Sequence, residues 1–491
     1  MRPIGLLPLA NGAAAPRDRV PRLALDELRR AVIAAPARGR RVAALFGRPA
    51  EGALELVLVL AADDEGVLEV GTSLLRDPGY PALTPACPEV HLFERELAEQ
   101  HGVRPEGHPW CKPVRYPRGG AGVTEFYSVD GDEVHEVAVG PVHAGVIEPG
   151  HFRFQCHGER VFHLEIALGY QHRGVERALG GGPHKRSMHH METLAGDTTI
   201  AHATAYSQLC EALAGTRPSA RAHALRAIAL ELERLANHTG GLGGLAHDVG
   251  FLPTAAYCGR LRGEFLNLTA TLCGSRFGRG FVRPGGTGFD VDGARAADML
   301  GRLDAAAHDV EGALALLWST GSVQARFEET GRLAQATARE LGLVGVAARA
   351  CGLPRDVRRN HPFGMYRFTH VPIATWASGD VFARAYVRAL EIQRSIELVR
   401  ALLGALPVGP VRAEAGALRA DQLAVSLVEG WRGEVCHVAL TDGAGRFASY
   451  KIVDPSFHNW SGLQLAMRDQ QISDFPLCNK SFDLSYCGHD L

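Results

Sequence analysis

The sequence of 491 residues lacks several features that would point to common functions. Its ten cysteines form no Cys-x-x-Cys pair, so the chain has no cysteine motif for an iron–sulfur cluster of its own. The longest apolar run, residues 54–62, is far shorter than the roughly 20 residues that cross a bilayer, and no transmembrane segment is expected. The formal net charge of −2 does not favour a nucleic-acid partner, because phosphate binding requires concentrated positive charge.

The scattered cysteines and the start of the chain favour a cytosolic protein. A disulfide framework is not expected in a chain of this length, so most cysteines are predicted to be reduced and to pack as small apolar residues. The first residues carry one arginine, a short apolar run and small side chains, a pattern that weakly resembles a signal peptide. Pro8 and Gly12 interrupt that run, and export is therefore not expected.

Length and composition predict a globular protein with two or three domains, since apolar residues make up 46% and charged residues 22% of the chain. Residues 1–115 alternate strand and helix patterns and are predicted to form a small α/β domain. One helix in this part is expected to end at Gly102. Residues 116–139 are rich in glycine and charge and are the expected linker.

Residues 140–491 are predicted to form a larger domain dominated by helices, which makes the fold class α+β. One amphipathic helix is expected to begin after Ser219 as its N-cap and to stop at the glycine pair 240–241. Another long helix is expected to begin near Asp380. A strand pattern returns over about residues 423–453, with Thr-Asp-Gly-Ala-Gly as a hairpin turn.

Two stretches of the first domain, FERELAEQHGV and PEGHPW, resemble the small hydrophilic subunit of respiratory complex I that carries a Glu-Arg-Glu signature. The matching residues are Phe93, Glu94, Arg95, Glu96, His101, Gly102, Val103, Glu106, Gly107, His108 and Pro109. The resemblance implies that residues 1–115 adopt the fold of that subunit.

From Gly140 onward, the chain resembles the large subunit that complex I shares with nickel–iron hydrogenases. The matching blocks follow the family's order and include LGYQHRGVER, ETLAGDTTIAHATAY, RGFVRPGG and EGWRGEVCHVALTDGAGRFASYKIVDPSF. A fusion of these two subunits is typical of formate hydrogenlyase-type, energy-converting hydrogenase complexes. The resemblance implies an oxidoreductase subunit that packs against a small iron–sulfur subunit. It also implies a ferredoxin-like subunit and antiporter-like membrane subunits in the same complex, with this chain peripheral at the cytoplasmic face of the membrane.

Hydrogenase members of this family bind nickel and iron through two Cys-x-x-Cys pairs, because soft thiolates hold these metals. Gly196 and His202 match the motif of the first pair and fix its register. In that register Ala195 and Thr198 occupy the two cysteine positions. Neither side chain supplies a thiolate.

The second cysteine pair belongs to a motif at the end of the chain. Asp483 fixes the register and places Ser485 and Gly488 at the cysteine positions. Cys487 is one residue out of register, and Cys478 lies further upstream. The sequence therefore argues against a conventional nickel–iron centre, while an unusual metal set that uses Cys478 and Cys487 stays open.

Complex I, which also lacks these cysteines, has a quinone cavity nearby. The resemblance implies that His143 and Gly196 line the corresponding pocket. The second quinone-loop histidine of the family is replaced by Ile147, and the quinone tyrosine by Gly196. The pattern thus departs from that of ordinary ubiquinone chemistry.

Three more residues are implied to act in the pocket. Glu148 resembles a glutamate that passes protons to the hydrogenase metal, and the alternative is a surface turn residue. Arg432 resembles an arginine above the hydrogenase open site, where a guanidinium stabilises negative charge, and the alternative is a structural ion pair. His202 matches a family histidine and shares a helix face with Tyr206 and Cys210, for which a packed core is the favoured interpretation.

Two other patterns are not interpreted as sites. The segment with His184, His189 and His190 is histidine-rich, but adjacent residues diverge on a helix, so a polar loop is favoured over a metal site. The glycine-rich stretches follow no phosphate-loop spacing, and nucleotide binding is not supported.

Three functions are compatible with the sequence. In the first, a quinone-like or other acceptor is reduced in the pocket, and Glu148, His202 and Arg432 handle protons and charge. In the second, the chain is a non-catalytic element that couples motion or protons to the membrane arm. In the third, it is a hydrogenase large subunit with unusual metal ligation. No covalently bound cofactor is expected, and the iron–sulfur cluster is expected in a partner subunit.

Overall fold

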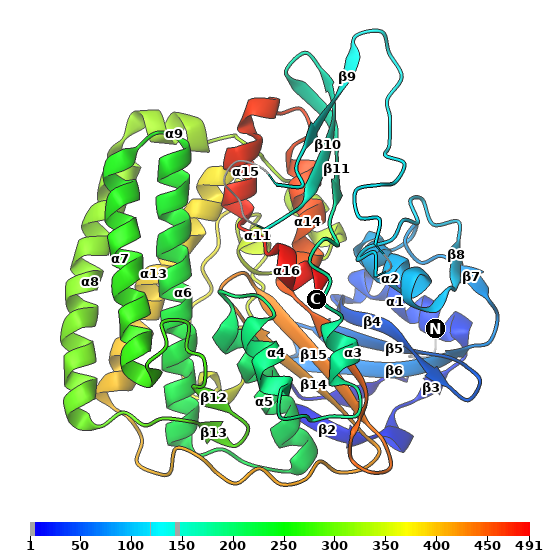
Figure 1. The fold of residues 1–491 in the computed structure, drawn as a ribbon, viewed down its shortest axis with the longest axis horizontal. Helices are drawn as coiled ribbons and strands as arrows, with labels where there is room; N and C mark the ends of the chain where they lie inside the picture. Colours follow the sequence, from blue (N-terminus) through cyan, green and yellow to red (C-terminus); the bar gives the residue numbers. More distant parts are fainter. Residues whose placement is uncertain (1–4, 118, 143–147) are drawn as a thin grey trace.

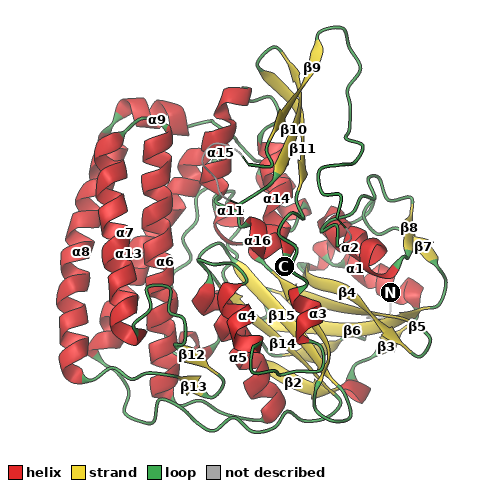
Figure 2. Ribbon diagram, in the orientation of Figure 1, coloured by secondary structure: helices red, strands yellow, loops and turns green. Residues whose placement is uncertain are grey.

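A computed structural model describes residues 5–117, 119–142 and 148–491 (Figure 1). Helices and several small sheets form an α+β fold, as the sequence predicts (Figure 2). Long helices stand at one side of the molecule and the N-terminal sheet at the other, with a second sheet between them. None of the helices in these ranges is long and apolar enough to cross a membrane.

The N-terminal sheet is built from the predicted strands. In spatial order it contains β1 (Leu7–Leu9), β6 (Val67–Leu75), β5 (Ala53–Ala62) and β4 (Arg41–Ala50), with β3 (Arg22–Leu23) parallel to β6. Helices α1 (Leu25–Ala34) and α2 (His91–His101) pack on β6 and β4, and a small parallel pair is formed by β7 (Gly79–Pro81) and β8 (Arg104–Glu106). Helix α2 ends at Gly102, whose φ of 70° confirms the predicted glycine stop.

The central sheet joins the two ends of the chain. Its order is β16 (Phe447–Val453), β15 (Glu434–Thr441), β14 (Gln422–Glu429) and β2 (Ala13–Pro16), all antiparallel. The β15–β16 hairpin confirms the predicted strand return and turn. A third sheet contains β11 (Arg160–Ala167), β10 (His151–His157) and β9 (Val134–Val139). The division into 1–115, 116–139 and 140–491 stays a prediction, and β2 shows that the first of these segments contributes a strand to the sheet of the last.

The long helices are α6 (Ala220–Asp248), α7 (Leu252–Cys273), α8 (Gly293–Ser319) and α13 (Val381–Gly404), and they pack on one another. Ser219 and Asp380 are the N-caps of α6 and α13, as predicted, since their side chains accept from Ala222 N and Ala383 N.

The predicted stop of α6 at residues 240–241 is wrong, because the helix continues to Asp248. Its glycines serve close packing instead. A Cβ on Gly240 would lie 2.6 Å from Arg262 Cδ, and one on Gly243 would lie 2.8 Å from Cys258 Cβ, both on α7. The backbone hydrogen bonds of α6 and its packing against α7 outweigh the low helix propensity of glycine at these positions.

The remaining elements are mostly short. They are α3 (Val175–Leu179), α4 (Ser187–Thr193), α5 (Thr199–Ala214), β12 (Val282–Arg283), β13 (Gly286–Thr287), α9 (Gly321–Phe327), α10 (Gln335–Glu340), α11 (Gly345–Arg349), α12 (Val357–Asn360), α14 (Pro455–Ala466), α15 (Phe475–Phe482) and α16 (Tyr486–Asp490). Of these, α5 packs directly on β14 and β15 and is buried along most of its length.

The Glu-Arg-Glu residues of α2 explain why the N-terminal region stays attached to the rest. Glu94 accepts from the backbone of the 83–84 turn, and Arg95 donates to the carbonyls of residues 112 and 113. Glu96 reaches across to Lys451 Nζ on β16 at 2.6 Å and also pairs with Arg115. Glu96 therefore makes a buried ionic contact between the two sheets, while Glu94 and Arg95 fix neighbouring segments of the N-terminal region.

Candidate functional site

A cavity of about 490 Å³ lies where α15 and α16 meet the ends of α6 and the loop after β14. It is large enough for a small organic molecule. Both charged and apolar side chains line it: Val139, Glu148, Asp197, Asp248, Arg432, Ile472, Ser473, Phe475, Pro476, Asn479, Lys480, Asp483, Leu484 and Tyr486. Two of the predicted catalytic residues, Glu148 and Arg432, are thus found on one cavity wall.

Arg432 is held in place by a fork of hydrogen bonds. Its Nη1 and Nη2 donate to the two carboxylate oxygens of Asp197 at 2.6 and 2.9 Å, and its Nε donates to Asp483 O at 2.6 Å. The guanidinium carbon lies 3.9 Å from the ring centroid of Trp431. Burial lowers the pKa of Arg432, but the charge and hydrogen bonds of Asp197 outweigh it and raise the pKa above its ordinary value. The arginine is therefore a fixed positive charge in the cavity wall, and it does form the ion pair that was its alternative interpretation.

Glu148, which also lines the cavity, lies beside Cys487. Cys487 N donates to Glu148 Oε1 at 3.4 Å, and Ser485 Oγ lies 3.4 Å from Cys487 Sγ. Burial, together with the neighbouring Glu148 carboxylate, raises the pKa of the Cys487 thiol to about 11. Cys478, on α15, does not contact Cys487, because its sulfur packs against Gly331 instead.

The positions aligned with the four metal-binding cysteines are each occupied by a group with a packing role. Ala195 is fully buried, and Thr198 Oγ1 accepts from Arg432 Nη1 at 3.1 Å. Ser485 Oγ accepts from Gly488 N at 2.9 Å and so caps α16. A Cβ placed on Gly488 would lie 2.7 Å from the carboxylate of Asp454. The Asp454 carboxylate therefore fills the space that a side chain at position 488 would occupy.

This contact leads to a prediction for a pair of glycine variants. In Gly488→Ala the new methyl must displace Asp454, so we expect the free energy of unfolding to fall by about 1–3 kcal/mol. Gly196→Ala is the matched control, because a Cβ there meets no atom within 4 Å, and its stability should stay within about 0.5 kcal/mol of the parent. Chemical denaturation of the three proteins side by side measures both effects. Equal stability of the two variants would contradict the packing described for Gly488.

His202 is placed behind the cavity wall rather than in it. The side chain has no exposed surface; its Nε2 lies 3.0 Å from Asp454 Oδ2 and its Nδ1 lies 3.1 Å from His437 Nε2. Gly196 lies at the surface with open space in front of it. His143 and Ile147 lie outside the described residues.

The other sequence candidates fall in different places. Tyr206 and Cys210 are buried on α5, while His184 and His189 are exposed. Within the described ranges, no group of three or more His, Cys, Asp or Glu side chains is arranged to hold a metal ion.

Sequence reasoning missed three acidic residues and one basic residue of the cavity: Asp197, Asp248, Asp483 and Lys480. Asp197 carried a usable signal, since it stands between Gly196 and Thr198 in the motif that fixed the register. Asp248 is the last residue of α6, and burial raises its pKa although Lys480 opposes this. Its place at the cavity follows from the length of α6, which the sequence pattern underestimated.

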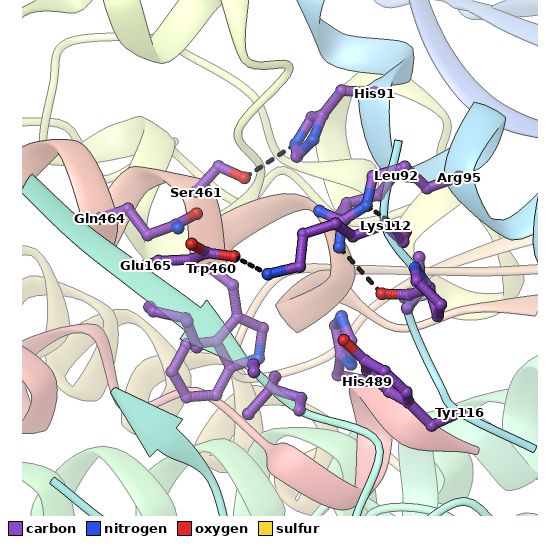
Figure 3. A pocket seen from close by; sticks show the side chains of 15 residues that line it. His91, Leu92, Arg95, Lys112, Tyr116, Glu165, Trp460, Ser461, Gln464 and His489 are labelled. Atoms are coloured by element: carbon purple, nitrogen blue, oxygen red, sulfur yellow. Dashed lines mark hydrogen bonds and ion pairs between the residues drawn. The ribbon is translucent and has the colours of Figure 1, made fainter. Parts of the chain in front are cut away.

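A second cavity at the seam between α2 and α14 is much smaller (Figure 3). Its volume of about 30 Å³ matches a water molecule rather than an organic acceptor. His91 bonds Ser461 and Lys112 bonds Glu165 around it, as Figure 3 shows. The cavity beside Arg432, which two of the predicted catalytic residues line, is therefore the candidate site.

Comparisons with known proteins agree with both parts of the chain. The family described as respiratory-chain NADH dehydrogenase, 30 Kd subunit, matches residues 32–123, and the 49 Kd subunit family matches residues 248–424. The carbon monoxide-induced hydrogenase of Rhodospirillum rubrum is 30% identical over 350 residues, which cover 71% of this chain and 97% of that protein.

Two further relatives cover similar shares. Formate hydrogenlyase subunit 5 of Escherichia coli K12 is 29% identical over 84% of this chain and 77% of its own. NADH-quinone oxidoreductase subunit 4 of Thermus thermophilus is 27% identical over 72% of this chain and 92% of its own. These relatives are subunits of oxidoreductase complexes. The chain therefore belongs to the family of large subunits that the NADH dehydrogenase 49 Kd subunit shares with these hydrogenases, here fused to a segment of the 30 Kd subunit family.

Proposed function

We propose that the chain is the large subunit of a membrane-associated oxidoreductase complex, and that a quinone-like or other acceptor is reduced in the cavity beside Arg432. The observation that carries this proposal is the cavity itself, which combines a fixed guanidinium, the Glu148 carboxyl group and apolar walls. The names of the relatives, which include quinone oxidoreductases and hydrogenases, support the reaction class.

The side chains suggest how the acceptor is handled. Phe475, Leu484 and Tyr486 provide apolar surface against which a ring can pack. As electrons arrive, the acceptor oxygen gains negative charge, which the Arg432 guanidinium stabilises. Glu148 gives or takes a proton at the cavity wall. Family resemblance assigns His143 and Gly196 to the corresponding pocket of relatives; His143 lies outside the described residues, and Gly196 is not among those that line this cavity. His202 acts from behind the wall, through Asp454.

A conventional nickel–iron centre does not fit these residues. The four aligned positions offer a methyl group, two hydroxyls already engaged in hydrogen bonds, and a glycine with no room for a side chain. Soft thiolate ligands are what such a centre requires. No step of the proposed mechanism runs through nickel or iron held by this chain.

The proposed partners follow the family. Electrons reach the cavity from a small iron–sulfur subunit, a ferredoxin-like subunit feeds that cluster, and antiporter-like subunits form the membrane arm. The chain itself is placed as a peripheral subunit on the cytoplasmic side of the membrane. Coupling to proton movement is part of the same proposal.

Metal analysis of the purified complex, combined with an acceptor-reduction assay, tests the proposal. We expect iron from partner clusters, nickel far below one atom per chain, and reduction of a quinone analogue. Stoichiometric nickel would instead favour a hydrogenase with unusual ligands, for which the position of Cys487 next to Glu148 is the one supporting observation. An intact complex that reduces no acceptor would favour a non-catalytic coupling subunit.

A further inference from the structure

A row of four buried polar side chains runs behind the cavity. Asp454 Oδ2 lies 3.0 Å from His202 Nε2, and His202 Nδ1 lies 3.1 Å from His437 Nε2. His437 Nδ1 lies 2.8 Å from the hydroxyl of Tyr450. All four side chains are almost completely buried, with Tyr450 the most exposed at 5%. The row begins on the residue before α14, crosses α5 and ends on the β15–β16 hairpin.

The hairpin holds the two outer members together. Tyr450 is opposite Ala439 across the strands, so His437 is its diagonal neighbour on the same face. Helix α5 lies on that face and brings His202 against His437. No local sequence pattern indicates this arrangement, because the four residues come from three separate segments.

The hydrogen bonds of the row have one consistent direction. An ionised carboxylate only accepts, so His202 Nε2 donates to Asp454. In the neutral form of His202 the other nitrogen, Nδ1, accepts, which requires His437 Nε2 to donate. His437 in turn accepts at Nδ1, and the Tyr450 hydroxyl donates to it. Every proton in the row therefore points from Tyr450 toward Asp454.

The electrostatic surroundings favour an ionised Asp454 and a neutral His437. Burial raises the pKa of Asp454, but its hydrogen bond and electrostatic interaction with His202 and the charge of Arg432 outweigh burial and lower that pKa. Burial lowers the pKa of His437 well below its ordinary value, so this ring is neutral at rest. Around Tyr450 the neighbouring titratable groups are Cys210, Tyr206 and Cys436, all uncharged because burial raises their pKa values.

We propose that Tyr450, His437, His202 and Asp454 form a proton relay that delivers protons toward the cavity. The proposal rests on the proposed function, since an acceptor that gains electrons in the cavity must also take up protons. In this role the four residues do not touch the acceptor; they carry the proton that it receives.

Each transfer conserves protons and moves no electrons. A proton that reaches the Tyr450 oxygen lets the original hydroxyl proton pass to His437 Nδ1. His437 releases its Nε2 proton to His202 Nδ1, and His202 releases its own Nε2 proton to Asp454 Oδ2. The result is a neutral Asp454 carboxylic acid, two neutral imidazoles with exchanged tautomers, and an intact tyrosine. After Asp454 releases its proton toward the cavity, a second transfer requires each imidazole proton to return from Nδ1 to Nε2 and the Tyr450 hydroxyl to reorient toward His437.

Both ends of the relay have polar neighbours. The carboxylate of Asp454 lies against Gly488, on α16. At the start of this helix Ser485 Oγ lies 3.4 Å from Cys487 Sγ, and Cys487 N donates to Glu148 Oε1 at 3.4 Å. At the other end, the ring of Tyr206 lies 6.2 Å from that of Tyr450. The hydroxyl of Tyr206 interacts with Ser187, next to the exposed residues 183–186. The histidine-rich segment that gave no metal site thus lies where protons would enter.

The test uses the purified complex with His437→Gln and Tyr450→Phe. Glutamine keeps a donor toward His202 and an acceptor toward Tyr450, but an amide does not pass a proton on. We expect acceptor reduction at saturating acceptor to fall about 10-fold or more in both variants, with KM nearly unchanged. The solvent deuterium isotope effect on turnover should rise, because proton delivery becomes rate-limiting. A role in positioning alone would leave the His437→Gln variant active.

Tyr80→Phe is the matched control, since it removes a buried tyrosine hydroxyl on β7, outside both the relay and the cavity wall. Its turnover should stay within about 2-fold of the parent, since it belongs to no proton path. Wild-type turnover and isotope effect in both relay variants would overturn the relay and leave the proposed function standing. If His437→Gln does not fold, Tyr450→Phe alone decides the outcome. If the relay variants lose acceptor reduction while variants of Arg432 and Glu148 keep it, the proposed cavity is rejected and the relay stands.

Discussion

Replacing Arg432 by glutamine is expected to reduce acceptor reduction by the complex about 10²-fold or more, with a smaller effect on KM. The guanidinium is the one cation of the cavity wall that is fixed by several hydrogen bonds in the described structure, and it lies beside the space where the acceptor would gain charge. Loss of a single preorganised donor in such a site typically costs this much in turnover. Steady-state kinetics with a quinone analogue, over a range of acceptor concentrations, measures the change.

The Arg432→Gln variant also leaves Asp197 without its partner, and this effect has to be separated from loss of the positive charge. The double variant Arg432→Gln/Asp197→Asn removes both charges and restores a neutral pair. If the guanidinium acts on the acceptor, the double variant stays slow. Recovery of the parent rate in the double variant would contradict the proposed role and leave Arg432 as a structural residue. Arg446→Gln, at an exposed pair with Asp442, is the control for arginine loss in the same part of the chain.

The elements of the fold were predictable where one local pattern decides them. The caps Ser219 and Asp380, the glycine stop at 102 and the β15–β16 hairpin all follow from neighbouring residues. The end of α6 was not predictable in this way. Its glycines look like a stop signal locally, but packing against α7 uses them for close approach. Tertiary contacts override propensity at such positions.

The candidate site was predictable only in part, because its residues come together across the whole sequence. Motif resemblance found Arg432 and Glu148, and both line the cavity. The partner of Arg432 is 235 positions away at Asp197, and no local pattern indicates that pairing. The row from Tyr450 to Asp454 was unpredictable for the same reason, because His202 contacts His437 only after helix α5 has packed across the β15–β16 hairpin.

The largest loss of stability is expected for Glu391→Gln on α13. This carboxylate accepts from Arg349 Nε at 2.9 Å, from His238 Nε2 at 2.8 Å and from Arg234 Nη1 at 3.3 Å, and none of these partners is exposed. Burial raises the pKa of Glu391, but Arg349 and His238 outweigh it and hold the pKa well below its ordinary value. Removing one member of a buried ion pair costs about 3–5 kcal/mol, since the remaining charges stay buried without compensation.

An exposed ion pair of the same helix, α13, provides a control that separates this cluster from ion pairs in general. Asp304→Asn breaks the exposed pair between α8 and Arg400 of α13, which should cost about 1 kcal/mol or less. Urea denaturation of the two variants should therefore show midpoints that differ clearly, and equal midpoints would contradict the importance of the buried cluster.

The buried cluster also connects stability to the site. Arg234, which Glu391 holds, donates from Nη2 to Glu429 O at 2.7 Å and from Nη1 to Gly430 O at 3.1 Å. These carbonyls begin the loop that presents Arg432 to the cavity. We therefore expect Glu391→Gln to lower acceptor reduction even at temperatures where the variant is folded, whereas Asp304→Asn should not. A folded Glu391→Gln protein with full activity would show that the loop keeps its position without the cluster, and that the guanidinium of Arg432 is held by Asp197 and Asp483 alone.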